Sequence, residues 1–172
     1  MNAPIPAWVG DVLEPVPEIE VHRQGLRHRA VSVFATRGPR DVLIRQRARA
    51  AYLAPGLWSC AWHGHPAWDE DVAACAARLM RDGAAPDAGA PLWRGTAEYR
   101  APLVGGFVEH ERVEVFALRD AAAEAPGPAG AGGPDAIWID VEDLRAEMRR
   151  RPERFVPWLR VALSEHLPLV LD

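Results

Sequence analysis

Histidine and acidic side chains that could hold a metal ion or move a proton recur in this sequence at short spacings. The stretch SCAWHGHPAWDED places His63 and His65 two positions apart, and Glu109 and Glu111 share this spacing in FVEHERVEVFALR. Because the side chains of a strand alternate between its two faces, each pair points to one face if its segment is extended. Imidazole and carboxylate groups together suit Zn²⁺, Mn²⁺, Fe²⁺ or Mg²⁺.

Two further histidines precede these pairs in the chain. His28 opens the segment HRAVSVFATR, and His22 lies six residues earlier. Two carboxylates on one face are costly unless a cation or a proton is shared between them. The other interpretation of Glu109 and Glu111 is a solvated outer face of a sheet, on which each acid is hydrated separately. The spacing of these residues leaves both interpretations open.

The composition narrows the class of protein. A chain of 172 residues, 49% of them hydrophobic, suits one domain with a sizeable core. The net charge of −4 is not that of a nucleic-acid-binding protein. All 20 basic residues are arginine, so any anionic ligand must be held by Arg, His, backbone N–H groups or a metal ion. Two cysteines, no signal peptide and no stretch apolar enough to span a membrane predict a soluble cytoplasmic protein.

Hydrophobic periodicity and turn residues predict a fold of the α+β class. Alternating segments predict four strands, over 28–37, 41–47, 94–103 and 107–119. The stretch GLWSCAWHGH also has the aromatic content of a strand, and a short strand is expected before Asp140. The Ala/Gly/Pro-rich stretch 121–135 is expected to be a surface loop.

Three helices are expected to accompany these strands. One spans roughly 70–82 and is capped by Asp69 or Asp71. A second follows Asp140, and a third covers 153–167. The apolar face of this third helix consists of Phe155, Trp158, Leu159 and Leu163.

The stretch GHPAWDEDVAACAARLMRDGA keeps part of a Nudix box. This box carries a Gly, a Glu and an Arg at fixed spacing, and further glutamates on one helix that bind the Mg²⁺ chelated by a diphosphate. Gly64, Glu70 and Arg78 stand at the spacing of the box, whereas Leu79 and Gly83 stand where it has glutamates. The missing carboxylates argue against a working Nudix pyrophosphohydrolase.

Seven short motifs, taken together, resemble the type I isopentenyl-diphosphate isomerases, a family with the Nudix fold. They are LRHRAVSVF, LIRQRA, PGLWS, GHP, EYRA, VEHE and FVPWL, and they follow one another in family order over about residues 20 to 160. The resemblance implies a single domain over 21–172, with a Nudix-like mixed sheet sandwiched by helices, after an extended lead-in over 1–20. It also implies a reaction, in which a proton is added to the double bond of isopentenyl diphosphate and another is removed from the opposite side of the resulting carbocation.

The resemblance also implies the residues of the site. The family's metal ligands fall on His22, His28, His65, Glu109 and Glu111. A divalent metal ion such as Zn²⁺, Mg²⁺ or Mn²⁺ is therefore expected as the cofactor. The family's catalytic acid falls on Glu111, its assisting tyrosine on Tyr99 and its cation-facing tryptophan on Trp158. We also expect Arg47, Arg78 and Trp62 to contact a small isoprenoid substrate, in the form of a diphosphate.

The sequence departs from the family at two points. His63 stands where the family has its catalytic cysteine, and an imidazole is competent for proton transfer near neutral pH, so His63 is either a base or a further metal ligand. At the diphosphate end, Ala51 replaces a family lysine, and Gly83 replaces the Glu that holds the family's second ion, Mg²⁺. The lost contacts weaken the binding of a diphosphate unless Arg45 or Arg49 compensates.

Several functions are compatible with these residues. The first is an isomerase in which histidine has replaced the catalytic cysteine. The second is a repurposed relative that protonates a longer prenyl chain or a prenylated metabolite, leading to double-bond migration or cyclisation. The third is a Nudix-fold binding protein without catalysis, against which the retained His and Glu residues argue.

Overall fold

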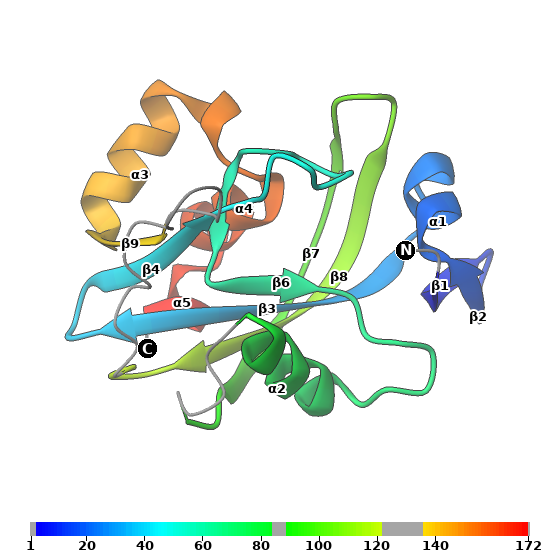
Figure 1. Cartoon of the computed structure of the whole chain (residues 1–172), viewed down its shortest axis with the longest axis horizontal. Coiled ribbons are helices and arrows are strands. Elements are labelled where there is room, and N and C mark those ends of the chain that lie inside the picture. Colours follow the sequence, from blue (N-terminus) through cyan, green and yellow to red (C-terminus); the bar gives the residue numbers. More distant parts are fainter. Residues whose placement is uncertain (1–2, 84–88, 122–135, 172) are drawn as a thin grey trace.

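A long strand, β3 (His28–Arg37), is the centre of the fold. The computed structural model describes residues 3–83, 89–121 and 136–171. Within these ranges nine strands form a mixed sheet, in which β3 runs parallel to β8 (Val108–Leu118). This pairing places His28 opposite Glu111, so the two segments that carry candidate ligands lie side by side (Figure 1).

Five further strands extend the sheet on both sides of this pair. They are β4 (Asp41–Gln46), β5 (Trp58–Cys60), β6 (Trp62–Gly64), β7 (Leu92–Pro102) and β9 (Ala136–Asp140). All of them pair antiparallel with their neighbours: β7 with β8, β6 with β3, and both β5 and β9 with β4. The stretch GLWSCAWHGH is thus extended as predicted, and it changes its pairing partner from β4 to β3 at Ala61.

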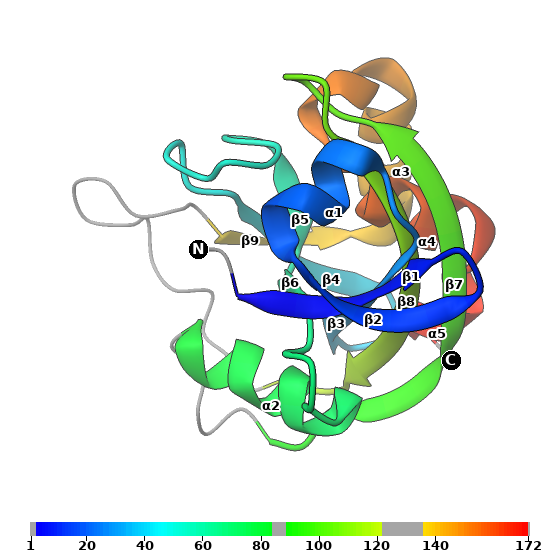
Figure 2. The same ribbon diagram turned by 90° about the vertical axis from the view of Figure 1, so that its right-hand side faces the viewer.

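The N-terminal segment differs from the expected lead-in. Its residues are extended, but β1 (Pro4–Val9) and β2 (Val12–Pro17) form a hairpin, and β1 pairs with β3 at Ala7 and His28. The helix α1 (Glu18–Gln24) follows directly (Figure 2). Ile5 and Ala7 are buried against Val21 of α1, and this small core explains why the segment packs onto the sheet.

Helices cover both faces of the sheet, as predicted for this fold class. The helix α2 (Val72–Asp82) packs on the face of β3 that carries Val31 and Val33. The opposite face, which carries Phe34, is covered by α3 (Val141–Arg150), α4 (Pro157–Glu165) and α5 (Leu167–Leu171) (Figures 1 and 2). The caps of α2 and α3 are Asp71 and Asp140, whose carboxylates each accept two backbone N–H bonds.

The last predicted helix begins later than expected. Pro152–Arg154 form a 3₁₀ turn, and α4 starts only at Pro157. The residue before a proline avoids the helical region, and Val156 accordingly has φ −65° and ψ 150°. Phe155 therefore lies outside the helix, although it is buried in the same core as Trp158.

Two other findings concern the chain as a whole. No helix in the described part of the chain is long and apolar enough to cross a membrane. The expected loop 121–135 lies, apart from Ala121, outside the described residues.

The turn at Gly25 supports a first prediction. Gly25 ends α1 with φ +64°, and a Cβ there would lie 3.0 Å from the Cβ of Val108, whereas Gly10, with φ +62°, has nothing within 4 Å. Gly10→Ala should lower the free energy of unfolding by about 1 kcal/mol through backbone strain alone. Gly25→Ala should lower it further, because Val108 must also move. Urea denaturation of both variants measures this difference, and equal losses would show that Val108 yields freely.

Candidate active site

Three imidazoles and a carboxylate meet between α1, β3, the end of β6 and β8. One ligand atom each from His22, His28, His65 and Glu109 lies within 4.8 Å of all the others. Glu109 and Glu111 are 1% and 0% exposed, so the interpretation of these acids as a solvated outer face is wrong. The structure thus brings together residues that are widely separated in the sequence.

The hydrogen bonds of two histidines fix their orientation. His22 donates from Nδ1 to the carbonyl oxygen of Glu18, and His28 donates from Nδ1 to that of Leu26, each at 2.8 Å. A carbonyl can only accept, so the Nε2 lone pairs remain free and point toward Glu109, at 3.4 and 3.6 Å. These two Nε2 atoms and Glu109 Oε2 are buried and have no hydrogen-bond partner. Orphaned acceptors of this kind, backed by a second shell of carbonyls, fit a divalent cation.

His65 is held between two carboxylates. Its Nδ1 lies 3.2 Å from Glu18 Oε1, and its Nε2 lies 3.3 Å from Glu111 Oε1. Burial alone would lower the pKa of His65, but these carboxylates outweigh it and raise the pKa to about 10. The hydrogen bond from His65 in turn holds the pKa of Glu18 at about 2. The charges of the cluster are therefore balanced by opposite charges within it.

A second group forms around Glu111. Tyr99, its cross-strand partner on β7, donates a hydrogen bond of 2.7 Å to Oε2, and His63 Nε2 lies 3.2 Å from Oε1. Burial raises the pKa of Tyr99 well above its usual value, so the phenol stays protonated. Burial opposes the ionisation of Glu111, but His63, His28 and His65 together hold its pKa well below the usual range. A proton donor, a carboxylate and an imidazole are thus in direct contact.

The indole of Trp158 forms a wall of this group. His63 stacks on it with ring centroids 4.2 Å apart and an interplanar angle of 15°. Trp158 Nε1 donates to Ser59 Oγ at 2.9 Å, and Ser32 Oγ lies 2.9 Å from His63 Nδ1. The Arg47 guanidinium carbon is 5.3 Å from the centre of the indole. His63 therefore covers one face of the tryptophan for which the family resemblance implies contact with a carbocation.

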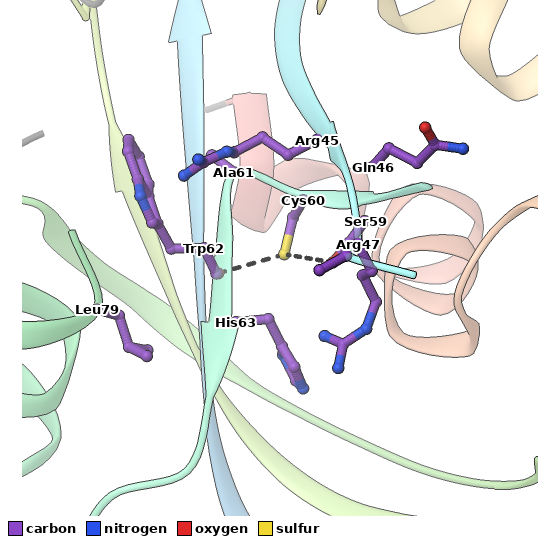
Figure 3. A pocket seen from close by; sticks show the side chains of 10 residues that line it. Arg45, Gln46, Arg47, Ser59, Cys60, Ala61, Trp62, His63 and Leu79 are labelled. Carbon is purple, nitrogen blue, oxygen red and sulfur yellow. Dashed lines mark hydrogen bonds between the residues drawn. The ribbon is translucent and has the colours of Figure 1, made fainter. Parts of the chain in front are cut away.

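Two neighbouring pockets open onto these residues. One, of about 350 Å³, is lined by residues that include Glu18, Arg47, Tyr52, His63, His65 and Trp158. The other, of about 550 Å³, is lined by residues that include Arg45, Arg47, Trp62 and His63 (Figure 3). Arg47 and His63 line both, so a ligand with an apolar part and an anionic part can extend from one pocket into the other.

Arg78 lies apart from these pockets. Its guanidinium donates to both carboxylate oxygens of Glu70 at 2.7 Å and to the carbonyl oxygen of His65 at 3.0 Å. The expectation that Arg78 contacts the substrate is not supported by these contacts, because its donors hold the loop after β6 against α2. Cys60 is also no reactive group: its thiol is buried, donates to the carbonyl oxygen of Trp62 at 3.3 Å, and has its pKa raised by burial to about 11.

Sequence reasoning missed three polar residues of the site. Glu18 contacts His65 and accepts a 2.7 Å hydrogen bond from Tyr52, and Ser32 contacts His63. Ser32 lies four positions after His28 in β3, so alternation places both on one face of the strand. No comparable signal marks Glu18 and Tyr52, since they reach the site from a helix and a loop.

Comparison with known proteins places this geometry in a family. The Nudix domain family matches residues 26–159. The isopentenyl-diphosphate Delta-isomerase of Dinoroseobacter shibae is 44% identical over 165 residues, which cover 94% of this chain and 92% of that protein. The chain belongs to the isopentenyl-diphosphate Delta-isomerase family. The isomerase of Rhodobacter capsulatus is 42% identical, with 96% of this chain and 94% of that protein covered.

Solved structures support the fold of this isomerase-family chain. A crystal structure from Deinococcus radiodurans has a TM-score of 0.69 at 16% identity, and the match covers 95% of this chain and 97% of the other. A MutT protein from Methanosarcina mazei has a TM-score of 0.56 at 14% identity, with coverages of 80% and 91%. At these identities the likeness concerns the Nudix fold alone.

The contacts of Arg78 yield a prediction for this isomerase-family chain. Arg78→Ala should lower the free energy of unfolding at pH 7 by about 1–2 kcal/mol. Arg81→Ala, an exposed position on the same helix, should change it by less than about 0.5 kcal/mol. Arg78 lowers the pKa of Glu70, so the pair stabilises the fold above the unfolded pKa of about 4.3 and loses its effect as the pH falls further. Thermal unfolding at pH 7 and below pH 4 measures this, and a pH-independent difference would contradict it.

Proposed function

We propose that this protein is an isomerase that converts isopentenyl diphosphate to dimethylallyl diphosphate. The observation that carries the proposal is the buried contact of Tyr99, Glu111 and His63 beside a pocket that also holds Arg47. The protein's 44% and 42% identity to proteins named as this isomerase supports the same reaction. The retained site argues against a non-catalytic Nudix-fold protein.

The reaction consists of two proton transfers. A proton is added to the terminal methylene carbon of isopentenyl diphosphate, and the double-bond electrons form the new C–H bond, which leaves a tertiary carbocation. A proton is then lost from the carbon on the other side of the cation, and its bonding electrons form the new double bond. Two groups that exchange protons are therefore required, and each must be close to the substrate.

The residues can share these two tasks. Glu111, hydrogen-bonded to the Tyr99 hydroxyl, delivers the first proton in its protonated form, which it must regain in each turnover because the neighbouring histidines hold its pKa low. His63 accepts the second proton. Ser32 and Trp158 fix the ring of His63 from its edge and its face. Because His63 and Glu111 are 3.2 Å apart, proton removal from the opposite side requires the substrate to displace His63 from Glu111.

A divalent cation completes the proposed site. His22, His28, His65 and Glu109, whose ligand atoms lie within 4.8 Å of one another, would hold it together with Glu111. The orphaned buried atoms of His22, His28 and Glu109 and the donor types of the whole set fit Zn²⁺, Mn²⁺ or Mg²⁺. When bound, such an ion supplies a positive charge that fixes its carboxylate ligands and shifts their protonation. The protein's own side chains orient the substrate, exclude water and move the protons.

A deuterium experiment tests the proposed reaction. The metal-loaded protein is incubated in D₂O with isopentenyl, geranyl or farnesyl diphosphate, and the products are analysed by mass spectrometry. We expect deuterium in dimethylallyl diphosphate, because the proton that enters the methylene group comes from a site that exchanges with solvent. Label only in a longer or cyclised product would establish the repurposed relative instead. No label in any product would contradict both.

The role of His63 is tested by removing its imidazole. His63→Ala should lower kcat for isopentenyl diphosphate about a hundredfold or more, since a positioned acid or base contributes factors of this size. Its metal content, measured by mass spectrometry, should equal that of the wild type, whereas His22→Ala should lose the ion. His110→Ala is the matched control, because this residue lies on β8 between the two acids and faces away from them. A metal-free His63→Ala protein would make His63 a ligand.

A further inference from the structure

The larger pocket contains two arginines that approach it from the β4 side. Arg45 lies near the end of β4, and Arg47 follows two positions later (Figure 3). Arg45 donates to the carbonyl oxygen of Gly83 at 3.1 Å, and Arg47 donates to that of Leu53 at 3.1 Å. Within the described ranges neither guanidinium forms an ion pair with a carboxylate. Burial lowers the pKa of both guanidinium groups, because each is a cation partly removed from water.

Gly83, at the end of α2, is surrounded by other side chains. A Cβ built on it would lie 2.9 Å from Arg45 Nη1 and 2.6 Å from Trp62 Cδ1, and it would also meet Trp62 Nε1. Contacts this short are not tolerated, so a side chain at position 83 requires Arg45 and Trp62 to move. The indole of Trp62 and the guanidinium of Arg45 therefore occupy the space that a longer residue at position 83 would fill.

The described residues of this region offer no group of acids for a second divalent cation. Asp82, which precedes Gly83 in the chain, has a side chain that is 62% exposed, and it faces Arg78 at 3.9 Å. In the part of the chain that the structure describes, the groups of His, Cys, Asp and Glu that could hold an ion all include His65. Among the described residues, the positive charge at this end of the pocket is therefore that of arginine.

We propose that Arg45 takes the place of the second cation and, with Arg47, binds the diphosphate of the substrate. The inference rests on the proposed isomerase function, because it names the residues that hold the anionic end of that substrate. Guanidinium groups match phosphate oxygens with paired donors and stay charged at all physiological pH values. Arg47 and His63 line both pockets, so an anion held in the larger one leaves the alkene beside His63, whose Nε2 lies 3.2 Å from Glu111 Oε1.

Binding of inorganic pyrophosphate tests the inference without requiring catalysis. Titration calorimetry is carried out on the protein loaded with its first metal ion, with and without Mg²⁺ in the buffer. Arg45→Gln should weaken pyrophosphate binding about tenfold or more, the loss expected for one charge-assisted contact. Arg45→Lys should retain part of the affinity. Mg²⁺ should not tighten binding to the wild type, because the described residues at this end of the pocket form no group of ligands for it.

The matched variant is Arg49→Gln. Arg49 is exposed, lies two positions beyond Arg47 and is the other arginine that the sequence leaves open for this task. Its substitution should change the pyrophosphate Kd by less than about twofold. Melting temperatures confirm that each variant is folded. An unchanged Kd in Arg45→Gln, or a tenfold gain in wild-type affinity on adding Mg²⁺, would overturn the inference.

Kinetics separate this inference from the proposed reaction. With isopentenyl diphosphate, Arg45→Gln should raise KM about tenfold and leave kcat within a few-fold of the wild type, because Arg45 binds the part of the substrate that does not react. Pyrophosphate binding that depends on Arg45, in a protein without isomerase activity, would refute the proposed reaction and keep the anion site. Isomerase activity that is insensitive to Arg45→Gln would keep the reaction and refute the role of Arg45.

Discussion

The burial of two carboxylates side by side on β8 is the constraint on which the rest of the site depends. Glu109 and Glu111 are removed from water, and two such charges would repel each other strongly without compensation. The fold compensates them with imidazoles from α1, β3 and the segment after β6. The packing of the N-terminal hairpin and α1 onto the sheet therefore has an electrostatic reason as well as a hydrophobic one. It delivers His22 to a place where a cation or a shared proton is required.

Much of this arrangement could be predicted from the sequence, because strand periodicity is local. Alternation in β8 put Glu109 and Glu111 on one face, and the turn residues defined β3 and β4 correctly. The burial of that face could not be predicted, since it depends on the parallel register that sets His28 opposite Glu111. Glu18 was missed for a related reason. It lies in a segment expected to be an extended lead-in, and only the hairpin and helix bring it to His65.

The histidine at position 63, where the family has a cysteine, is held by several neighbouring side chains. An imidazole is larger than the thiol expected at this position, and the structure accommodates it by stacking it on Trp158. The indole Nε1 of Trp158 donates a hydrogen bond to Ser59 Oγ. The Nδ1 of His63 is hydrogen-bonded to Ser32 Oγ. The imidazole and the aromatic wall thus form one unit, in which one face of the indole is covered by His63. Sequence comparison alone presents His63 as an isolated exchange, whereas its contacts link it to three other side chains.

The two ends of the site differ in how their charge is set. At the carboxylate cluster, histidine nitrogens leave lone pairs that an exchangeable cation can use, so the charge there depends on the metal ion and on pH. At the end of α2, the absence of a side chain at Gly83 makes room for Arg45 and Trp62, and the charge is a permanent part of the chain. From the sequence alone, Gly83 in place of the family's glutamate indicates only the loss of a metal ligand. In the structure this glycine leaves space that Trp62 and Arg45 fill, and Arg45 lies on a strand far away in the sequence. Because a guanidinium is covalently part of the chain and cannot leave the site as a metal ion can, the proposed binding of the diphosphate by Arg45 would not depend on the supply of a second metal ion.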